Sequence, residues 1–343
     1  MYPNLQRYLQ SHSQMEPVDL IKYCYQSVLG PGHMAPDRQT AAARVREELA
    51  ACGRPDFYLP DFERLEGGAA RLDIGCGLRP ESVAGLFCLT AEKWPLLLRG
   101  YRQVLEMMRH PDVRACLPFP AADLDRAIED WEAQRWPAVS HSQRYHQCYR
   151  ANYRVIYEKY LPFLEAIQAL ESLPRPAVVA IDGRCGSGKS TLAEVLAYIF
   201  GAQVVHMDDF FLPFEQKTPQ RLARPGGNVH YERFNQEVTP LLRSGQAISY
   251  GVYDCASGTI LRRRLVLPSR LLLVEGSYSQ SPDIGFDYDL RIFVTTDPDT
   301  QLARITARDP AKAEAFRTRW IPMEEQYFAA FDIQRGADLV VRT

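Results

Sequence analysis

The chain has 343 residues, 46% of them hydrophobic and 24% charged, which is enough apolar sequence for two ordinary domain cores. Forty basic side chains nearly balance forty-two acidic ones, so no chain-wide field would attract nucleic acid or an anionic membrane surface. The first residues lack the features of a secretory signal and no apolar run could span a bilayer, so we expect a cytoplasmic protein.

Residues 1–170 show no alternation of apolar strands with amphipathic helices, and we predict a mostly α-helical domain. The expected helices are 38–51, 80–110 with a break at Pro95, 121–134, and 142–170 with a break near Pro162. Tyr145, Tyr149, Tyr153 and Tyr157 recur at every fourth residue of the last one. Such a stripe is typical of the buried face of a helix.

Two patterns in this domain resemble functional sites but lack the context that these need. Arg71-Leu-Asp-Ile-Gly-Cys-Gly77 is similar to the glycine-rich loop of methyltransferases that use S-adenosylmethionine, yet residues 66–70 do not indicate a buried strand before it. The spacing of His141, His146 and Cys148 does not put all three on one helical face, as a zinc site would need. The eight cysteines lie singly, which predicts reduced thiols.

The domain boundary is expected at Glu171-Ser-Leu-Pro-Arg-Pro176, where two prolines interrupt the helical pattern. This divides the chain into domains 1–170 and 171–343.

From residue 177 onward, predicted strands alternate with predicted helices. The strands are 177–181, 203–207, 247–253, 270–274, 289–295 and 338–341, and the main helices are 189–200, 231–244, 297–308 and 311–330. This alternation is typical of a doubly wound, mainly parallel α/β sheet.

A phosphate-binding motif follows the first of these strands. Gly183-Arg-Cys-Gly-Ser-Gly-Lys-Ser190 matches the Walker A pattern GxxxxGK[ST] at every fixed position, and a predicted helix follows it. Its backbone N–H groups can bind the phosphates of ATP, Lys189 can reach the β and γ phosphates, and the Ser190 hydroxyl can ligate Mg²⁺. The predicted nucleotide-binding residues are Gly183, Arg184, Cys185, Gly186, Ser187, Gly188, Lys189, Ser190 and Thr191.

Two further residues are interpreted with this loop in mind. Glu275 ends an apolar strand and is a candidate for the magnesium site opposite Ser190. Cys185 lies inside the loop, where positive potential would lower its thiol pKa and make it sensitive to oxidation.

Four elements in order resemble the uridine kinase-like branch of the P-loop nucleoside and nucleotide kinases, which includes phosphoribulokinase and bacterial pantothenate kinase. After the P-loop these are His206-Met-Asp-Asp-Phe-Phe211, Tyr253-Asp254, Glu275-Gly276, and Leu302-Ala-Arg-Ile-Thr-Ala-Arg-Asp309. The resemblance covers the chain from about residue 177 to its end. It implies a magnesium-dependent kinase that transfers the γ-phosphoryl group of ATP to a hydroxyl of a small molecule.

The resemblance also assigns roles. Asp208 matches the catalytic carboxylate, which would orient the acceptor hydroxyl and take its proton, while Arg304 and Arg308 match the lid and would neutralise charge on the phosphoryl group. Lys189 completes the catalytic set. The candidates for the acceptor pocket are Asp208, Asn228, His230, Tyr231 and Tyr253.

The acceptor pocket departs from the family pattern. His230 stands where uridine kinases carry an aspartate for ribose, and Gly258 stands where they carry a histidine for the pyrimidine. We therefore expect an acceptor other than uridine, nucleoside-like or another hydroxylated metabolite.

A second hypothesis is a regulatory ATPase that switches the first domain without any small acceptor. Asp208 and the lid arginines favour transfer, because a hydrolase needs a group that positions water. No guanine-specific [NT]KxD element is evident, which favours ATP over GTP. The first domain could cover the acceptor pocket, mediate homo-oligomerisation, or bind an effector or a partner protein.

Overall fold

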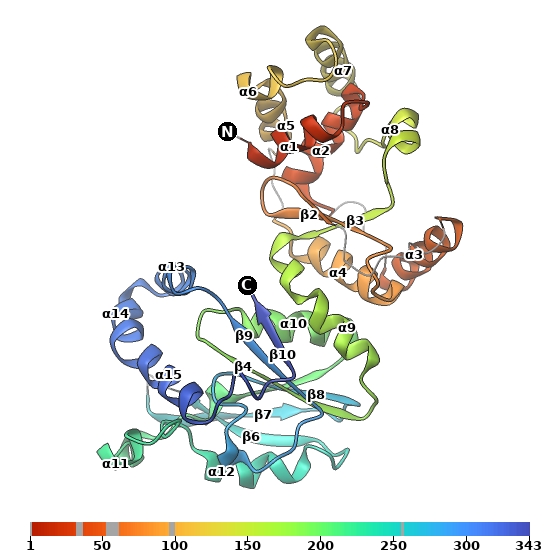
Figure 1. The fold of residues 1–343 in the computed structure, drawn as a ribbon. Helices are drawn as coiled ribbons and strands as arrows, with labels where there is room; N and C mark the ends of the chain where they lie inside the picture. Colours follow the sequence, from red (N-terminus) through yellow and green to blue (C-terminus); the bar gives the residue numbers. More distant parts are fainter. Residues whose placement is uncertain (1, 32–36, 53–61, 96–99, 255–256) are drawn as a thin grey trace. The chain divides into compact units, whose positions relative to one another are not determined.

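The computed structural model describes residues 2–31, 37–52, 62–95, 100–254 and 257–343 (Figure 1). The chain divides into two compact units, Met1–Leu161 and Pro162–Thr343. This division lies before the boundary that we expected near residue 170. It assigns helix α9 (Leu164–Ser172), which packs against strand β10 (Leu339–Arg342), to the second unit.

The first unit combines helices with a small antiparallel sheet that we did not predict. The sheet has the order β1-β2-β3, with β1 at Phe62–Arg64, β2 at Ala69–Asp73 and β3 at Tyr153–Tyr157. The helices are α1 (Pro3–Ser11), α2 (Pro17–Leu29), α3 (Arg38–Cys52), α4 (Pro80–Lys93), α5 (Gly100–Arg109), α6 (Pro111–Arg114), α7 (Ala121–Ala133) and α8 (Gln143–Cys148).

The predicted helix 142–170 is wrong in its middle part, whereas its break near Pro162 and the helix after that break, α9, are confirmed. Ser142 caps the short helix α8 by accepting a hydrogen bond from Tyr145 N, and the chain is extended by Tyr149 and forms β3. The run Tyr-Arg-Val-Ile-Tyr is rich in aromatic and β-branched residues, which pack better on a pleated surface than on a helix. The tyrosines that recur at every fourth residue therefore belong partly to helix α8 and its end, and partly to strand β3.

The expectation that no buried strand precedes Gly75 is also wrong. Strand β2 is buried from Ala69 to Leu72. However, β2 pairs antiparallel with β1 and β3, whereas the methyltransferase loop belongs to a parallel sheet.

A buried polar chain in this unit joins three side chains from distant parts of the sequence. His141 Nδ1 lies 2.8 Å from Asp19 Oδ1, and its Nε2 lies 2.7 Å from the Tyr153 hydroxyl. Burial lowers the pKa of His141 to about 4, although the hydrogen bond to Asp19 opposes the shift. In the part of the chain that the structure describes, no cluster of three or more His, Cys, Asp or Glu could hold a metal ion.

The pKa of His141 predicts a pH dependence of stability. An unfolded histidine takes up a proton near pH 6.5, whereas folded His141 does so only near pH 4. The unfolded state therefore binds more protons between these values, and the free energy of unfolding should fall by ~3 kcal/mol as the pH drops from about 6.5 to about 4. NMR titration of the imidazole and urea unfolding across this range test the prediction, and a titration near pH 6.5 would contradict it.

The second unit is built on a parallel sheet, as predicted, but the sheet has five strands, because the predicted strand 247–253 does not belong to it. The order is β10-β9-β4-β8-β5, with β4 at Ala177–Gly183, β5 at Gln203–His206, β8 at Leu271–Glu275 and β9 at Leu290–Thr295. Strands β4 and β8 are buried along their whole length, as parallel strands covered on both faces require. Figure 1 shows α10 (Lys189–Phe200) and α12 (Tyr231–Glu237) on opposite sides of this sheet.

The path of the chain places a ligand site next to β4. From β4 the chain continues to β5 and β8 on one side, and then crosses to β9 and β10 on the other. Ligands of such sheets bind beyond the carboxyl ends of the strands, where the strand order reverses. The segment after Gly183 lies at this position.

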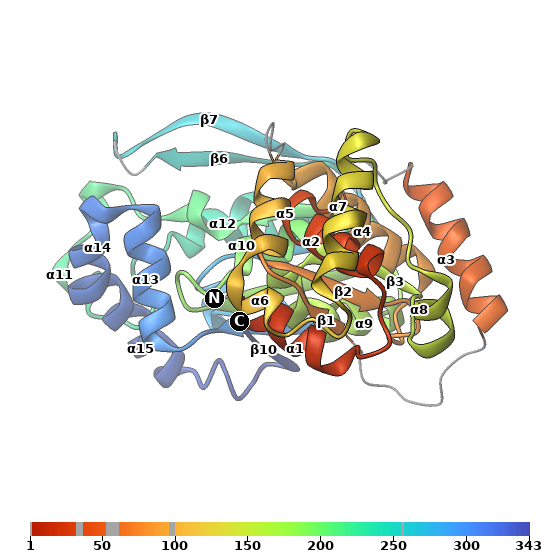
Figure 2. The same ribbon diagram turned by 90° about the horizontal axis from the view of Figure 1, so that it is seen from above.

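The two helices that we predicted after β9 are confirmed, but the second changes its helix type along its length. Helix α13 (Pro298–Arg308) is followed by α14 (Ala313–Ala315), a π-helical turn at Phe316–Trp320 and α15 (Ile321–Ala330). Figures 1 and 2 both show α13, α14 and α15 as neighbours.

The predicted helix 231–244 ends early because Pro240 cannot supply a backbone N–H, and a 3₁₀ turn at Thr239–Leu241 replaces its last part. Helix α11 (Pro219–Leu222) is a single turn.

A two-stranded hairpin completes the unit (Figure 2). We predicted β6 (Ile248–Asp254) but missed its partner β7 (Thr259–Val266). Three consecutive arginines in β7 hide the apolar alternation, and most of this strand is exposed.

Candidate active site

The loop between β4 and α10 has the backbone that a phosphate cradle requires. Gly183, Gly186 and Gly188 have φ angles of 139°, 73° and 97°, which side chains rarely allow. A Cβ at Gly183 would lie 2.0 Å from the Val294 carbonyl oxygen, so only glycine fits there. The predicted nucleotide-binding residues lie in this loop and in the first turn of α10: Gly183, Arg184, Cys185, Gly186, Ser187, Gly188, Lys189, Ser190 and Thr191.

Lys189 is held inside the loop. Its Nζ donates hydrogen bonds to the carbonyl oxygens of Gly183 at 2.8 Å and Arg184 at 3.0 Å, and the residue is 8% exposed. An ammonium group has three N–H donors. Two of them fix the side chain in place, and the third can bind a phosphate oxygen.

Ser190 and Glu275, which we expected to ligate Mg²⁺, are in contact with each other. The Ser190 hydroxyl donates to Glu275 Oε1 at 2.9 Å, and His206 Nδ1 lies 3.0 Å from Glu275 Oε2. Burial opposes ionisation of Glu275, but His206, Lys189 and Ser190 outweigh it and lower its pKa. Mg²⁺ usually takes one or two protein oxygens and completes its shell with waters and phosphate oxygens, so this pair fits the ion.

Asp208 lies on a 3₁₀ turn (Met207–Phe210) directly after β5. Its side chain is exposed, yet nearby protein atoms desolvate it in part. This desolvation raises the pKa of Asp208, the carboxylate of Glu275 raises it further, and Lys189 acts in the opposite direction. The site therefore combines an ionised carboxylate, Glu275, with a more basic one, Asp208.

Helix α15 contacts the loop through two adjacent carboxylates. Glu324 is 5% exposed and accepts hydrogen bonds from Cys185 N at 2.9 Å and from the Ser277 hydroxyl at 2.7 Å. Glu325 forms a bidentate ion pair with Arg184 at 2.6 and 2.9 Å. Arg184 is thus engaged by α15 rather than directed toward the cradle, and Glu324 occupies one of the loop's amide donors.

The hypothesis of a reactive Cys185 is wrong. Burial raises the pKa of Cys185 to about 12, and the carboxylate of Glu324 adds to the rise, which outweighs the positive charge of Lys189. The thiol is therefore protonated. The seven described cysteines form no disulfide bond, and Cys255 lies outside the described residues.

The two arginines from α13 occupy different places. Arg304 donates to the carbonyl oxygen of Gly186 at 3.4 Å and to the Thr343 hydroxyl at 2.8 Å, so it braces the backbone of the loop. Arg308 is exposed, and its guanidinium lies 5.6 Å from the centre of the Phe316 ring.

The predicted acceptor residues other than Asp208 lie at the start of α12, on β6 and in the segment between α11 and α12. His230 caps α12 by accepting from Arg233 N at 3.3 Å, and it pairs with Glu232 at 3.2 Å. Tyr231 is buried beside Gly226, where a Cβ would lie 2.7 Å from its hydroxyl oxygen. Tyr253 is buried on β6, and Asn228 is half-buried.

Sequence reasoning missed three residues of this site: Asp182, His206 and Glu324. Asp182 ends β4, is fully buried, and accepts hydrogen bonds from Tyr278 N, Gln280 N and the Tyr327 hydroxyl. Burial raises the pKa of Asp182 to about 6. An acid between an apolar strand and Gly183 was a visible signal, whereas Glu324 lies 139 residues from its partner Cys185.

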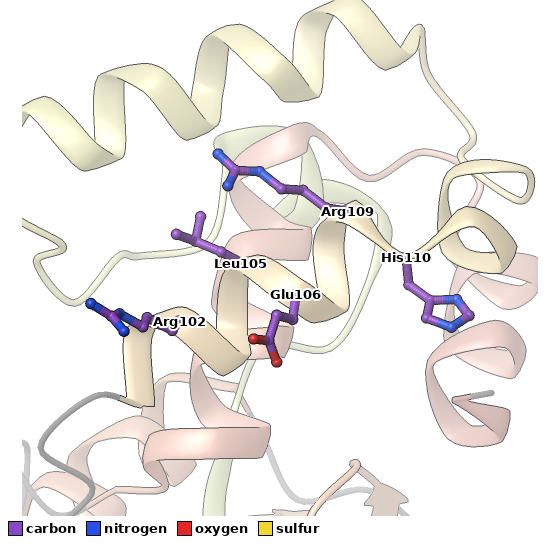
Figure 3. Close-up of a pocket in the computed structure, with 5 residues that line it drawn as sticks. All are labelled: Arg102, Leu105, Glu106, Arg109 and His110. Atoms are coloured by element: carbon purple, nitrogen blue, oxygen red, sulfur yellow. The ribbon is translucent and has the colours of Figure 1, made fainter.

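A separate pocket of about 420 Å³ lies on α5 in the first unit. Figure 3 shows Arg102, Leu105 and Arg109 on one side of the helix and Glu106 and His110 on the other. Arg109 already pairs with Glu132 at 3.4 Å, and the pocket is an open surface feature without converging polar groups.

Comparison with known proteins finds uridine kinases among the relatives of this chain. The chain is 25% identical over 181 residues to uridine kinase from Chlamydia pneumoniae, a match that covers 48% of this chain and 80% of that enzyme. It is 29% identical over 156 residues to uridine kinase-like protein 4 from Arabidopsis thaliana, covering 42% of this chain and 33% of that protein. The C-terminal half of this chain is similar to uridine kinases.

Among solved structures, the chain is similar to one described as a possible uridine kinase from Bacillus stearothermophilus. The two share 20% sequence identity and a TM-score of 0.40, and the match covers 53% of this chain and 96% of that chain. No protein-family model matches the chain. Among the described residues, no helix combines the length and the apolar character that crossing a membrane requires.

Proposed function

We propose that the second unit is an ATP-dependent phosphotransferase that transfers the γ-phosphoryl group of Mg-ATP to a hydroxyl of a small, nucleoside-like or otherwise hydroxylated metabolite. The observation that supports this most strongly is the combination, at one edge of the sheet, of the braced Lys189, the Ser190–Glu275 pair and the Asp208 carboxylate. Such a set provides phosphate binding, a metal position and a proton acceptor.

In this proposal the chemistry divides among few groups. Backbone N–H groups of the loop and Lys189 hold the phosphates, while Mg²⁺, bound by Ser190 and Glu275, would neutralise their charge. The acceptor oxygen forms a bond to the γ-phosphorus as the bond to the β–γ bridging oxygen breaks and ADP leaves. Asp208 takes the hydroxyl proton, and its raised pKa suits it to this role. Arg308 is proposed to stabilise the transferred group.

The proposal can be tested by following the product. The purified chain is incubated with Mg-ATP and a panel of nucleosides, pantothenate and phosphorylated sugars, and ³¹P NMR records new phosphate esters. One acceptor should yield an ester in equal amount to ADP. Release of ADP and free phosphate at the same rate with every acceptor would instead favour a regulatory ATPase.

The contact between Glu324 and Cys185 N predicts a competition with the nucleotide. A phosphate oxygen cannot accept from an amide that already donates to Glu324 Oε2, and the carboxylate adds a like charge at the site. Glu324→Gln keeps an oxygen that can accept from Cys185 N, but it removes the negative charge that strengthens this bond and repels phosphate. It should therefore bind Mg-ATP about tenfold more tightly, as measured by isothermal titration calorimetry.

Glu325→Gln is the matched control for this change. It removes the same charge from the same turn of α15 but leaves Cys185 N bonded to Glu324. We expect the gain only in Glu324→Gln. An equal gain in both variants, or weaker binding in Glu324→Gln, would show that Glu324 does not compete with phosphate.

A further inference from the structure

The centre of the first unit holds a charged side chain that burial makes costly. Arg71 lies on β2, the middle strand of the antiparallel sheet, and is 2% exposed. Its Nε donates to Gln26 Oε1 at 2.9 Å and its Nη1 to Glu63 Oε2 at 2.9 Å. Its Nη2 is buried and has no hydrogen-bond partner among the described residues. Buried guanidinium groups normally use all their donors.

Tyrosines surround this guanidinium. Its carbon lies 5.2 Å from the ring centre of Tyr8, 5.4 Å from that of Tyr23 and 4.7 Å from that of Tyr153. The hydroxyl of Tyr23 is also buried without a hydrogen-bond partner among the described residues, and that of Tyr8 lies close to Arg71 and Tyr145 but meets the geometry of a hydrogen bond with neither. The two rings lie 4.4 Å apart. Burial raises the pKa of both tyrosines, so both hydroxyls keep their protons and are donors.

Acceptors near this cluster are already engaged. Asp19 Oδ1 accepts from His141 Nδ1 and Ser142 N, and its Oδ2 accepts from the Ser142 hydroxyl and Glu16 N. A second cation, the half-buried Lys22, lies near Arg71 and donates to the carbonyl oxygen of Val139 at 3.2 Å; burial, and then the charge of Arg71, lower its pKa to about 8. Asp19 therefore offers no free acceptor to Arg71 Nη2 or to the two hydroxyl protons in these contacts.

We propose that the first unit contains a binding site for a small oxyanion, a carboxylate or phosphate group, formed by Arg71 Nη2 and the hydroxyls of Tyr8 and Tyr23. Oxyanions are the acceptors that a guanidinium edge and phenolic hydroxyls bind together. Glu63 is the carboxylate that competes for the same guanidinium. It reaches Arg71 from the edge strand β1 with its side chain 31% exposed, so its movement toward solvent opens the way to the site.

This site is independent of the proposed phosphotransfer, because all its residues belong to the first unit. It gives that unit a ligand of defined chemistry. If the chain turned over ATP without any acceptor, or not at all, the proposed anion site in the first unit would be unaffected.

The test measures anion-dependent stabilisation of the full chain. Thermal unfolding is followed at constant ionic strength while chloride is replaced by inorganic phosphate in one series and by acetate in another. A ligand that binds only the folded state raises the unfolding temperature with its concentration. Phosphate also binds P-loops, but the P-loop is the same in wild type and variant, so their difference reports on the first unit.

The decisive variant is Tyr8→Phe/Tyr23→Phe, with Tyr101→Phe, a tyrosine stacked on Trp136, as the control. The double variant should weaken the apparent affinity for one of the two anions by at least about tenfold, whereas Tyr101→Phe should not. The series that responds identifies phosphate or carboxylate. Equal anion dependence in wild type and double variant, in both series, would overturn the proposal in favour of buried water at these donors.

A second variant keeps the proposal testable if the double variant does not fold. Glu63→Gln removes the competing charge from the rim of the site without changing the buried tyrosines. It should bind the same anion about tenfold more tightly than wild type. Unchanged or weaker binding would contradict a site at Arg71.

Discussion

Asp208→Asn should reduce acceptor-dependent turnover of Mg-ATP by about a thousandfold, because the amide cannot take the proton of the acceptor hydroxyl. Mg-ATP binding should change little, since the hydrogen bonds that hold Lys189, Ser190 and Glu275 in place do not involve Asp208. Steady-state kinetics gives the first result and titration calorimetry the second.

Two comparisons make this prediction specific. Asp209→Asn changes the neighbouring carboxylate, which is buried and pairs with Arg264 at 3.2 Å, and should have a much smaller effect on turnover at equal folded fraction. The wild-type rate should also fall as the pH drops below the raised pKa of Asp208, because the base is then protonated. Equal losses in the two variants would argue against Asp208 as the base.

Lys189→Met should abolish measurable transfer and weaken Mg-ATP binding, with a loss of about a thousandfold or more in kcat/KM. Methionine has a similar length but lacks the ammonium group that can reach the β and γ phosphates. It also leaves the carbonyl oxygens of Gly183 and Arg184 without the donors they have now. Turnover and calorimetry measure the two effects.

Lys312→Met is the matched control, because Lys312 is exposed and forms an ion pair with Asp309 away from the P-loop. It should keep wild-type turnover. Melting curves of both variants separate loss of function from loss of fold. Normal turnover in a folded Lys189→Met protein would exclude the P-loop as the phosphate site.

The sheet of the second unit could be predicted because its strands are short apolar runs separated by amphipathic helices. Buried parallel strands such as β4 and β8 leave this signature in the sequence. The hairpin partner β7 could not be predicted in the same way, since an exposed strand needs no apolar alternation. The strand β3 was hidden for a different reason: its tyrosine spacing also suited a helix.

The residues of the candidate site also differ in how far the sequence could predict them. The P-loop residues and Glu275 could be predicted from local sequence, because the spacing itself creates the geometry. The partners that adjust the site come from distant segments: Glu324 on α15, His206 at the end of β5 and Tyr327 above Asp182. Their contacts depend on tertiary packing, which also buried Cys185 beside a carboxylate and reversed the expected direction of its pKa.

The central claim is tested most directly by the initial rate of ADP release from Mg-ATP, measured with and without each member of the acceptor panel. The account predicts that one acceptor strongly stimulates release and that Asp208→Asn removes the stimulation. Slow release that no acceptor changes, with the same rate in Asp208→Asn, would contradict a phosphotransferase and favour a regulatory ATPase.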